Sequence, residues 1–271
     1  MSAGTMTLPN GTAVSSLGPR DSLNVYHDIF EDRCYARHGI AFRDGDTVLD
    51  VGANTGLFVL WLNTLGHRSR VFALEPVPAI FQVMERNLRL HDRLGAVPVN
   101  VGLSDRDGTV EFTYYPNFSN ASTMHPDHSA RTADEARAYV ESQAHTLPAP
   151  LPWLISLCPA WLKWLICEAI RRYHLKTKRV KAEVRTLSTF LRERGLERID
   201  LLKIDAERSE GRILAGIEEA DWPRIRQAVV EVHDGEEATA RIERLLASKG
   251  FRVVAEPNPA MPGLALVYAV R

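Results

Sequence analysis

A run of small and turn-forming residues, DVGANTG at positions 50–56, directly follows an apolar stretch of the chain. Within it, the acidic Asp50 closes that stretch and is followed by Gly52, Asn54 and Gly56. A loop that binds a dinucleotide pyrophosphate needs glycines spaced as G-x-G-x-x-G, and this run lacks that spacing. Because a carboxylate at the strand end repels a diphosphate, the pattern favours a cationic ligand such as S-adenosylmethionine, which carries a sulfonium and an ammonium group.

Two further acidic residues follow the next predicted strands. Glu75 comes nineteen residues after Gly56, where a carboxylate can accept hydrogen bonds from both ribose hydroxyls. Asp105, preceded by Ser104, ends the following apolar run and is placed to meet an adenine amino group. Ligands of open α/β sheets bind beyond the carboxyl ends of the strands, so we expect these residues to line one crevice. Together with the turn, they predict a site for a cationic nucleoside.

Candidate groups for acid–base chemistry lie at the ends of two later predicted strands. Asp205 closes the strand 199–205, and His233 follows the strand 227–232. A methyl transfer from such a cationic donor to an alcohol would need a base that removes the hydroxyl proton, and the ordinary pKa of histidine suits a base near neutral pH. We therefore predict that His233 is the general base and that Asp205 shapes the acceptor site. The alternatives are a surface-loop histidine, and an Asp205 that caps a turn or pairs with Lys203 or Arg208.

Other residues near these strand ends are candidates for binding the acceptor. The stretch 114–125, rich in Tyr, Asn and Ser, leads into an insertion and fits an acceptor pocket, although such turns also occur without a function. Glu231 either orients His233 or is a structural acid at the end of its strand. The acceptor candidates are Tyr115, Asn117, His125, Glu207 and Glu231.

A divalent metal is an alternative occupant of the same strand ends. Asp205, Glu207, Glu231 and His233 offer oxygen and nitrogen ligands that can surround Mg²⁺. Their spacing along the chain is not compact, so the sequence predicts no metal ligand.

These residues need a sheet that brings the strand ends together. Apolar, β-branched runs without alternation are typical of parallel strands covered on both faces, and helix-like stretches lie between them. The predicted parallel strands are residues 47–51, 70–75, 199–205 and 227–232, and the predicted helices are 56–65, 78–91 and 236–249. A further strand is expected at 108–115, and an antiparallel edge hairpin at 251–255 and 264–270. The predicted fold is α/β, with a mostly parallel sheet.

Composition places the chain among ordinary globular proteins. Its 271 residues carry 33 Lys and Arg against 34 Asp and Glu, which gives no indication of nucleic-acid binding. Cys34, Cys158 and Cys167 form neither a paired framework nor a CxxC motif, so we expect a reducing cytoplasm and no structural zinc. Residues 1–20 lack the pattern of a secretory signal and are expected to be a disordered tail, followed by one domain at 21–271.

A mostly helical insertion interrupts the sheet pattern at about 116–179. Its apolar part, 150–174, is broken by prolines and charges and is a poor membrane span. We expect a helical cap on the core or a contact in a homodimer; a lid over a hydrophobic acceptor is the sharper hypothesis. The neighbouring basic run, 171–181, is either a solvated face or a docking site for an acidic carrier protein or anionic lipid headgroups.

Several segments in order resemble the FkbM family of S-adenosylmethionine-dependent methyltransferases. The segments are DTVLDVGANTGLF, ALEPVPAIFQVMERN, VGLSDRDGTVEFTYYPN, RTLSTFL, IDLLKIDAERSE and VVEVHD. The resemblance implies a class I, Rossmann-like methyltransferase fold with a seven-stranded sheet and one antiparallel hairpin. Carried over by position, Asp50, Gly52, Asn54 and Gly56 would line the methionine moiety, Glu75 would bind ribose, and Ser104 with Asp105 would face adenine.

One position departs from the pattern of that family. The family segment K-I-D-x-E-G-x-E matches this chain from Lys203 to Glu210, but Arg208 replaces the glycine.

The resemblance implies an O-methyltransferase acting on a hydroxyl or carboxyl group of a specialised metabolite, with S-adenosylmethionine as cofactor. The upstream segment 29–40 is similar to a subset that accompanies polyketide and nonribosomal-peptide biosynthesis, so the acceptor is expected to be partly apolar, either as a free molecule or presented by a carrier protein. The alternatives are a sugar O-methyltransferase of a glycolipid or polysaccharide, and an inactive scaffold that only binds the cofactor. An NAD-dependent oxidoreductase is disfavoured by the glycine spacing.

Overall fold

The computed structural model describes residues 3–116, 122, 159, 162, 165, 176–259, 261 and 263–271. Most of the predicted cap, together with Asn117 and His125, lies outside these described residues.

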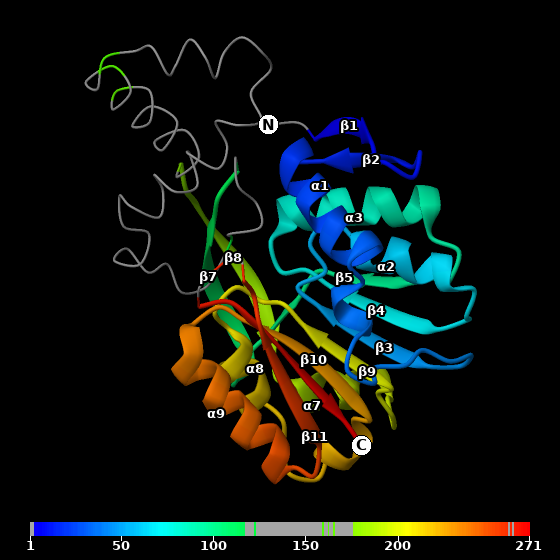
Figure 1. Cartoon of the computed structure of the whole chain (residues 1–271), viewed down its shortest axis with the longest axis vertical. Helices are drawn as coiled ribbons and strands as arrows, with labels where there is room; N and C mark the ends of the chain where they lie inside the picture. Colours follow the sequence, from blue (N-terminus) through cyan, green and yellow to red (C-terminus); the bar gives the residue numbers. More distant parts are fainter. Residues whose placement is uncertain are drawn as a thin grey trace.

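A seven-stranded sheet forms the centre of the protein (Figure 1). Its strands, in spatial order, are β11 (Arg252–Pro257), β12 (Ala265–Val270), β10 (Gln227–Val232), β9 (Leu201–Ile204), β3 (Thr47–Val51), β4 (Arg70–Leu74) and β5 (Val97–Val99). The strands from β10 to β5 pair in parallel, and β12 is antiparallel to both β10 and β11. This arrangement confirms the predicted class I fold with its C-terminal hairpin.

The order of the strands creates a binding crevice. The chain passes from β3 outward to β4 and β5, then returns to place β9 on the other side of β3. Such a reversal leaves an opening beyond the carboxyl ends of the two central strands, because their connections leave in opposite directions. The opening lies between the ends of β3 and β9, beside Gly52 and Asp205.

Helices cover both faces of the sheet (Figure 1). The helices are α1 (Pro19–Tyr26), α2 (Leu57–Leu62), α3 (Pro78–His91), α7 (Leu187–Arg194), α8 (Glu210–Ala215) and α9 (Gly235–Ser248). Short helical turns are η1 (His27–Glu31), η2 (Cys34–Ala36), η3 (Asn63–Leu65) and η5 (Trp222–Arg224). Among the described residues, no helix is long and apolar enough to cross a lipid bilayer.

Two separate cores follow from the alternation of side chains along the strands. Leu49 and Val51 of β3 point to the face that packs on α7, α8 and α9. Val48 points to the opposite face, which packs on α2, α3 and the N-terminal segment. Successive strand residues face opposite sides, so Asp50 must lie on the same face as Val48. Its carboxylate is therefore directed into a core that is otherwise apolar.

A second, three-stranded sheet lies beside the main one. It has the order β6 (Gly102–Leu103), β8 (Lys178–Arg185) and β7 (Gly108–Tyr114). The predicted strand at 108–115 is therefore confirmed, although it belongs to this smaller sheet. Because β8 begins at residue 178, the predicted end of the cap at 179 is about two residues too late.

The prediction that residues 1–20 are a disordered tail is wrong. Residues 4–16 form an antiparallel hairpin of β1 (Gly4–Thr7) and β2 (Ala13–Ser16), and α1 begins at Pro19. Leu8 and Val14 are buried in the core beside α3, which supplies the free energy that orders the hairpin.

The hairpin is also held by the side chain of Asn87. This fully buried amide on α3 accepts from the Ser15 backbone N at 2.7 Å and donates to the Ser15 carbonyl at 3.0 Å. It also donates to the Thr55 carbonyl at 2.9 Å, so it connects the hairpin with the glycine turn.

Candidate active site

A cavity of about 1060 Å³ opens at the carboxyl ends of the central strands. It is lined by the glycine turn after β3, by Glu75 after β4, and by residues that follow β9 and β10. Segments from both ends of the chain complete its wall, with Asp28 and Arg37 from the first and residues 256–259, 261 and 263–266 from the second. The cavity is large enough for a nucleoside-sized ligand together with a second molecule.

The glycine turn is shaped by a close approach of two backbones. Gly52 has a φ of +77°, and a Cβ atom there would lie 1.8 Å from the carbonyl oxygen of Asp205. No side chain fits in this space, so only glycine is compatible with the contact. Asn54 adopts a φ of +49°, a conformation that asparagine tolerates better than most residues. Contacts within the protein therefore set the conformation of the turn without a bound ligand.

Asp50 lies beneath this turn and is not among the residues that line the cavity. Its Oδ1 atom is 2.9 Å from the Nζ atom of Lys203, and both side chains are buried. Lys203 also donates a hydrogen bond to the Gly52 carbonyl at 3.2 Å and lies 3.6 Å from Asp205 Oδ2. The structure thus places Asp50 in a buried ion pair that supports the turn, not in the predicted contact with a ligand.

Burial and mutual attraction both shift the pKa values of Asp50 and Lys203. Burial raises the pKa of Asp50 despite the nearby ammonium group. Burial alone would lower the pKa of Lys203, but Asp50 and Asp205 raise it above its ordinary value. Lys203 is therefore an ammonium ion at neutral pH, and it holds the adjacent Asp50 in its carboxylate form.

Glu75 occupies the position expected for a residue that binds ribose. Its side chain lines the cavity, with Oε1 accepting from the Val77 amide at 2.9 Å and Oε2 from the Asn54 amide at 3.2 Å. Each carboxylate oxygen can accept two hydrogen bonds, so one acceptor position on each oxygen stays free. Burial raises the pKa of Glu75 to about 7.

Ser104 and Asp105 are placed differently from the expectation. Ser104 is buried and donates to Asp105 Oδ1 at 3.0 Å, and neither residue is among those that line the cavity. Asp105 instead lies 3.9 Å from Arg212 on α8. The residues just before them, 101–103, do line the cavity.

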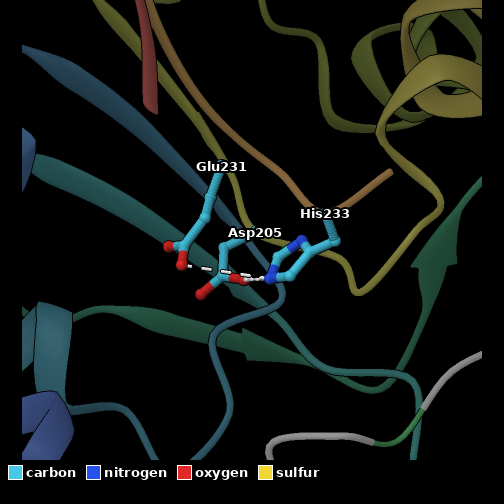
Figure 2. A group of neighbouring side chains, drawn as sticks. All are labelled: Asp205, Glu231 and His233. Atoms are coloured by element: carbon cyan, nitrogen blue, oxygen red, sulfur yellow. Dashed lines mark ion pairs between the residues drawn. The ribbon is translucent and has the colours of Figure 1, made fainter. Parts of the chain in front are cut away.

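Three polar side chains converge beyond β9 and β10, and we call Asp205, Glu231 and His233 the strand-end cluster (Figure 2). The His233 Nε2 atom lies 4.0 Å from Asp205 Oδ1 and 3.9 Å from Glu231 Oε1. The sequence separates Asp205 from the other two, but β9 and β10 are neighbours in the sheet and bring them together. The lack of compact spacing is therefore no argument against a metal.

His233 is surrounded by acidic groups. Its Nδ1 atom lies 2.9 Å from Glu210 Oε1, and Glu207 Oε1 lies 3.9 Å from its Nε2 atom. Burial would lower the pKa of His233, but Glu207, Glu210 and Asp205 raise it well above its ordinary value. The surroundings thus favour the imidazolium form, which cannot accept a proton and does not suit the general base predicted from the sequence.

Tyr35 is a site residue that the sequence did not reveal. It follows η1, and its hydroxyl group donates to Glu231 Oε2 at 2.8 Å and lies 3.3 Å from Asp205 Oδ2. Burial and the neighbouring Asp205 raise the pKa of Glu231 to about 8. Nothing in the local sequence marks Tyr35, because it reaches the site from more than 150 residues away along the chain.

Lys203 and Glu210 were matched within the family segment but were given no role. A signal was available for Lys203, since a lysine inside an apolar strand is unusual in a buried position. The structure places Lys203 under the glycine turn and Glu210 against His233.

The remaining candidates divide between the cavity and its surroundings. Glu207 lines the cavity, whereas Tyr115 follows β7 and is not among the lining residues. Arg208 has a φ of +73°, a conformation that favours glycine, which explains the glycine of the family segment. Its Nε atom lies 3.6 Å from Asp234 Oδ1.

Comparisons with known proteins agree with this architecture. A family model described as "Methyltransferase FkbM domain" matches residues 50–152 and 164–253. The chain is 38% identical over 264 residues to "31-O-demethyl-FK506 methyltransferase FkbM" of Streptomyces tacrolimicus, covering 96% of this chain and 93% of that protein. It is 33% identical over 238 residues to "Methyltransferase sdnD" of Sordaria araneosa, covering 84% and 82%.

Two further comparisons concern a much longer protein and a solved structure of low sequence identity. The chain is 36% identical over 273 residues to part of "AMB antimetabolite synthetase AmbE" of Pseudomonas aeruginosa, covering 97% of this chain but 12% of that protein. Among solved structures, Aeropyrum pernix fibrillarin with bound S-adenosyl-L-methionine gives a TM-score of 0.46 at 14% identity, covering 99% of this chain and 82% of that one.

Proposed function

Because the chain belongs to the FkbM family of S-adenosylmethionine-dependent methyltransferases, we propose that it methylates a hydroxyl oxygen of a partly apolar specialised metabolite. The single observation that carries the proposal is the cavity, in which a carboxylate suited to ribose and a polar cluster suited to a hydroxyl group lie at strand ends on the two sides of β3. The methyl donor and the acceptor thus have separate binding regions in one cavity.

The donor half is the side of the cavity formed by the glycine turn and Glu75. The free acceptor positions on the two Glu75 oxygens fit the two ribose hydroxyls. Gly52 and Asn54 are placed to line the methionine moiety. When bound there, the cofactor supplies a methyl group on a positively charged sulfur.

The adenine base is assigned to an apolar part of the cavity wall. Val77, Ile80, Leu103 and Phe112 line the cavity, and Val77 is two residues from Glu75 in the chain. Apolar side chains suit a planar base. This assignment replaces Ser104 and Asp105, which lie behind the wall.

The acceptor half is the side formed by the strand-end cluster. During transfer the acceptor oxygen forms a bond to the methyl carbon, the carbon–sulfur bond breaks, and its electron pair stays on the sulfur. The hydroxyl proton leaves to a carboxylate of the strand-end cluster and then to solvent. The protein contributes mainly by aligning oxygen, carbon and sulfur, because the donor is already activated.

The acceptor class is supported by the wall of the cavity and by the relatives. Pro257, Pro259, Met261 and Leu264 line the cavity and suit an apolar molecule. A protein of very similar length and 38% identity carries the name of an FK506 methyltransferase. The predicted cap at about 116–179 stays a proposal as the lid on this side.

Presentation of the acceptor by a carrier protein is a second form of the proposal. It is supported by the matching segment within the much longer AmbE synthetase and by the basic run 171–181. A sugar acceptor and an inactive scaffold are the competing functions, and a cytoplasmic location stays a prediction.

Calorimetry and product analysis test the proposal. We expect the purified chain to bind S-adenosylmethionine, and Glu75→Gln to weaken that binding by about tenfold or more. Glu85→Gln, an exposed carboxylate on α3, is the matched control and should bind as the parent does.

Release of S-adenosylhomocysteine is then measured with three acceptor classes: a macrolide that has a free hydroxyl, a carrier-bound acyl chain and a sugar. Turnover with either of the first two supports the proposal. Turnover with the sugar alone would establish the sugar methyltransferase, and binding without any turnover would favour the scaffold.

A further inference from the structure

We propose that the strand-end cluster binds one divalent cation through Asp205 Oδ1, Glu231 Oε1 and His233 Nε2 (Figure 2). Each of the three residues offers one ligand atom within 4.8 Å of those of the other two, and His233 Nε2 lies 4.0 Å from Asp205 Oδ1 and 3.9 Å from Glu231 Oε1. These separations are too long for hydrogen bonds. Separations of this size suit a shared ion, because two ligand atoms bound to one Mg²⁺, Mn²⁺, Zn²⁺ or Ca²⁺ ion at about 2.0–2.5 Å lie at most about 4–5 Å apart.

The polar atom of each side chain that is not a proposed ligand is in contact with a residue outside the strand-end cluster. The Tyr35 hydroxyl group donates to Glu231 Oε2 and lies near Asp205 Oδ2, while Glu210 Oε1 pairs with His233 Nδ1. None of these three contacts uses Asp205 Oδ1, Glu231 Oε1 or His233 Nε2. Tyr35 and Glu210 are not members of the proposed ligand set, so they are independent evidence for its orientation.

In known metal centres, the residues that bind the metal are themselves held by neighbouring residues in a similar way. A ligating histidine usually has its other nitrogen fixed by a carboxylate or carbonyl group, and ligating carboxylates are themselves hydrogen-bonded. Glu210 is 1% exposed and is therefore a firm partner for Nδ1.

The charge around the cluster also favours a cation. Asp205, Glu207, Glu210 and Glu231 contribute four carboxyl groups near one imidazole, and Lys203 is shared with Asp50. A divalent ion offsets part of this negative charge and takes the place of the proton on His233 Nε2, which is released when the nitrogen binds the metal. Asp205, Glu231 and His233 all line the cavity, so an ion and its water ligands can enter.

Two oxygens and one imidazole nitrogen form a mixed donor set. Carboxylate oxygens suit Mg²⁺ and Mn²⁺, whereas imidazole suits the transition metals, so Mn²⁺ is the appropriate probe. Three protein ligands leave positions open toward the cavity. The ion's role there rests on the proposed function: it would bind the acceptor hydroxyl and make its proton more acidic.

Binding of Mn²⁺ to the whole chain, followed by electron paramagnetic resonance without donor or acceptor, tests the site. We expect one bound ion per chain, and at least about tenfold weaker binding in Asp205→Asn, Glu231→Gln and His233→Ala. Tyr35→Phe keeps all three ligands but loses their orientation, and is expected to weaken binding by about 10–100-fold. Thermal unfolding confirms that each variant is folded, and added Mn²⁺ should raise the Tm of the parent only.

A matched control is available on the surface. His67 Nδ1 lies 3.8 Å from Asp44 Oδ1 in an exposed pair of the same residue types. His67→Ala and Asp44→Asn should bind Mn²⁺ as the parent does. Parent protein that binds no Mn²⁺, or folded ligand variants that bind it unchanged, would overturn the proposal.

The outcome is independent of the proposed function. Mn²⁺ binding without methyl transfer to any acceptor supports the site and refutes the function. Equal methyl transfer with and without EDTA, by a chain that binds no Mn²⁺, supports the function and refutes the site.

Discussion

The carbonyl oxygen of Asp205 packs directly against Gly52, at a distance that excludes even a methyl group. This contact joins the turn after β3 to the end of β9, which are the two central strand ends of the sheet. The donor half and the acceptor half of the cavity therefore share one rigid junction.

Gly52→Ala should destabilise the protein severely. The added Cβ would lie 1.8 Å from Asp205 O, so the backbone must move, and the φ of +77° disfavours alanine as well. We expect a loss of more than about 3 kcal/mol in the free energy of unfolding, measured with urea. Gly66→Ala is the control: its φ is +76° but nothing lies within 4 Å, so only about 1–2 kcal/mol should be lost. Equal losses in both variants would show that the close contact does not matter.

Lys203→Met should leave the Asp50 carboxylate buried without its partner. Removing one member of a buried ion pair typically costs about 3–5 kcal/mol, and we expect a loss of this size in urea unfolding. The double variant Asp50→Asn/Lys203→Met should lose less than the sum of the two single losses, because the unpaired charge is gone. Lys181→Met, on the exposed side of β8, should change stability by less than about 0.5 kcal/mol. An additive double variant would argue against the pairing.

Arg208→Gly should be more stable than Arg208→Ala by about 1 kcal/mol, since only glycine adopts a φ of +73° without strain. Both variants lose the contact with Asp234, whose side chain is 45% exposed, so that loss is small and common to the two. Thermal and urea unfolding measure the difference. Identical stabilities would mean that the left-handed backbone at this position carries no strain.

Binding of S-adenosylmethionine should weaken as the pH falls below about 7. Burial raises the pKa of Glu75 to about 7, whereas ribose hydroxyls donate to its ionised form. Below that pH the carboxyl group must first lose a proton, so affinity should fall by up to about tenfold per pH unit. Calorimetry in buffers of different ionisation enthalpy should detect the released proton.

The same group affects the stability of the protein without ligand. The pKa of Glu75 is raised from 4.5 to about 7 by folding, so the folded state holds more protons than the unfolded state between these values. Its contribution to stability is therefore present below pH 4.5 and lost as the pH rises through about 7. Asp50 on β3, Lys203 on β9 and Tyr114 on β7 also face Glu75. Glu75→Gln removes this titrating group and keeps the neighbours, so the free energy of unfolding should depend less on pH between about 4.5 and 7. An unchanged dependence would mean that another group binds the proton.

The sequence was sufficient wherever one segment determines its own structure. The strand 47–51 and the helix 78–91 have the predicted bounds, because an apolar run between turn residues and an amphipathic pattern after Pro78 are local signals. The position of Glu75 beside the cavity followed from the same reasoning, since parallel strands end at one edge.

The parts that were missed depend on contacts between distant segments. The hairpin at 4–16 is ordered by Asn87 and the core beside it, and its own composition resembles that of a flexible tail. Ser104 is one residue beyond the part of its segment that faces the cavity. The partners of His233, and thus its charge, come from Glu207 before α8 and Glu210 at its first position, which no spacing rule connects to position 233.

Asn87 connects the first residues of the chain with the glycine turn, although these residues lie away from the cavity. No residue of the hairpin at 4–16 is among those lining the cavity, yet the same amide that holds Ser15 also holds the Thr55 carbonyl of the glycine turn. Trimming these residues would leave that amide half-satisfied and the turn unsupported from behind. A shortened recombinant version should therefore be judged by its affinity for the methyl donor, and not only by whether it stays in solution.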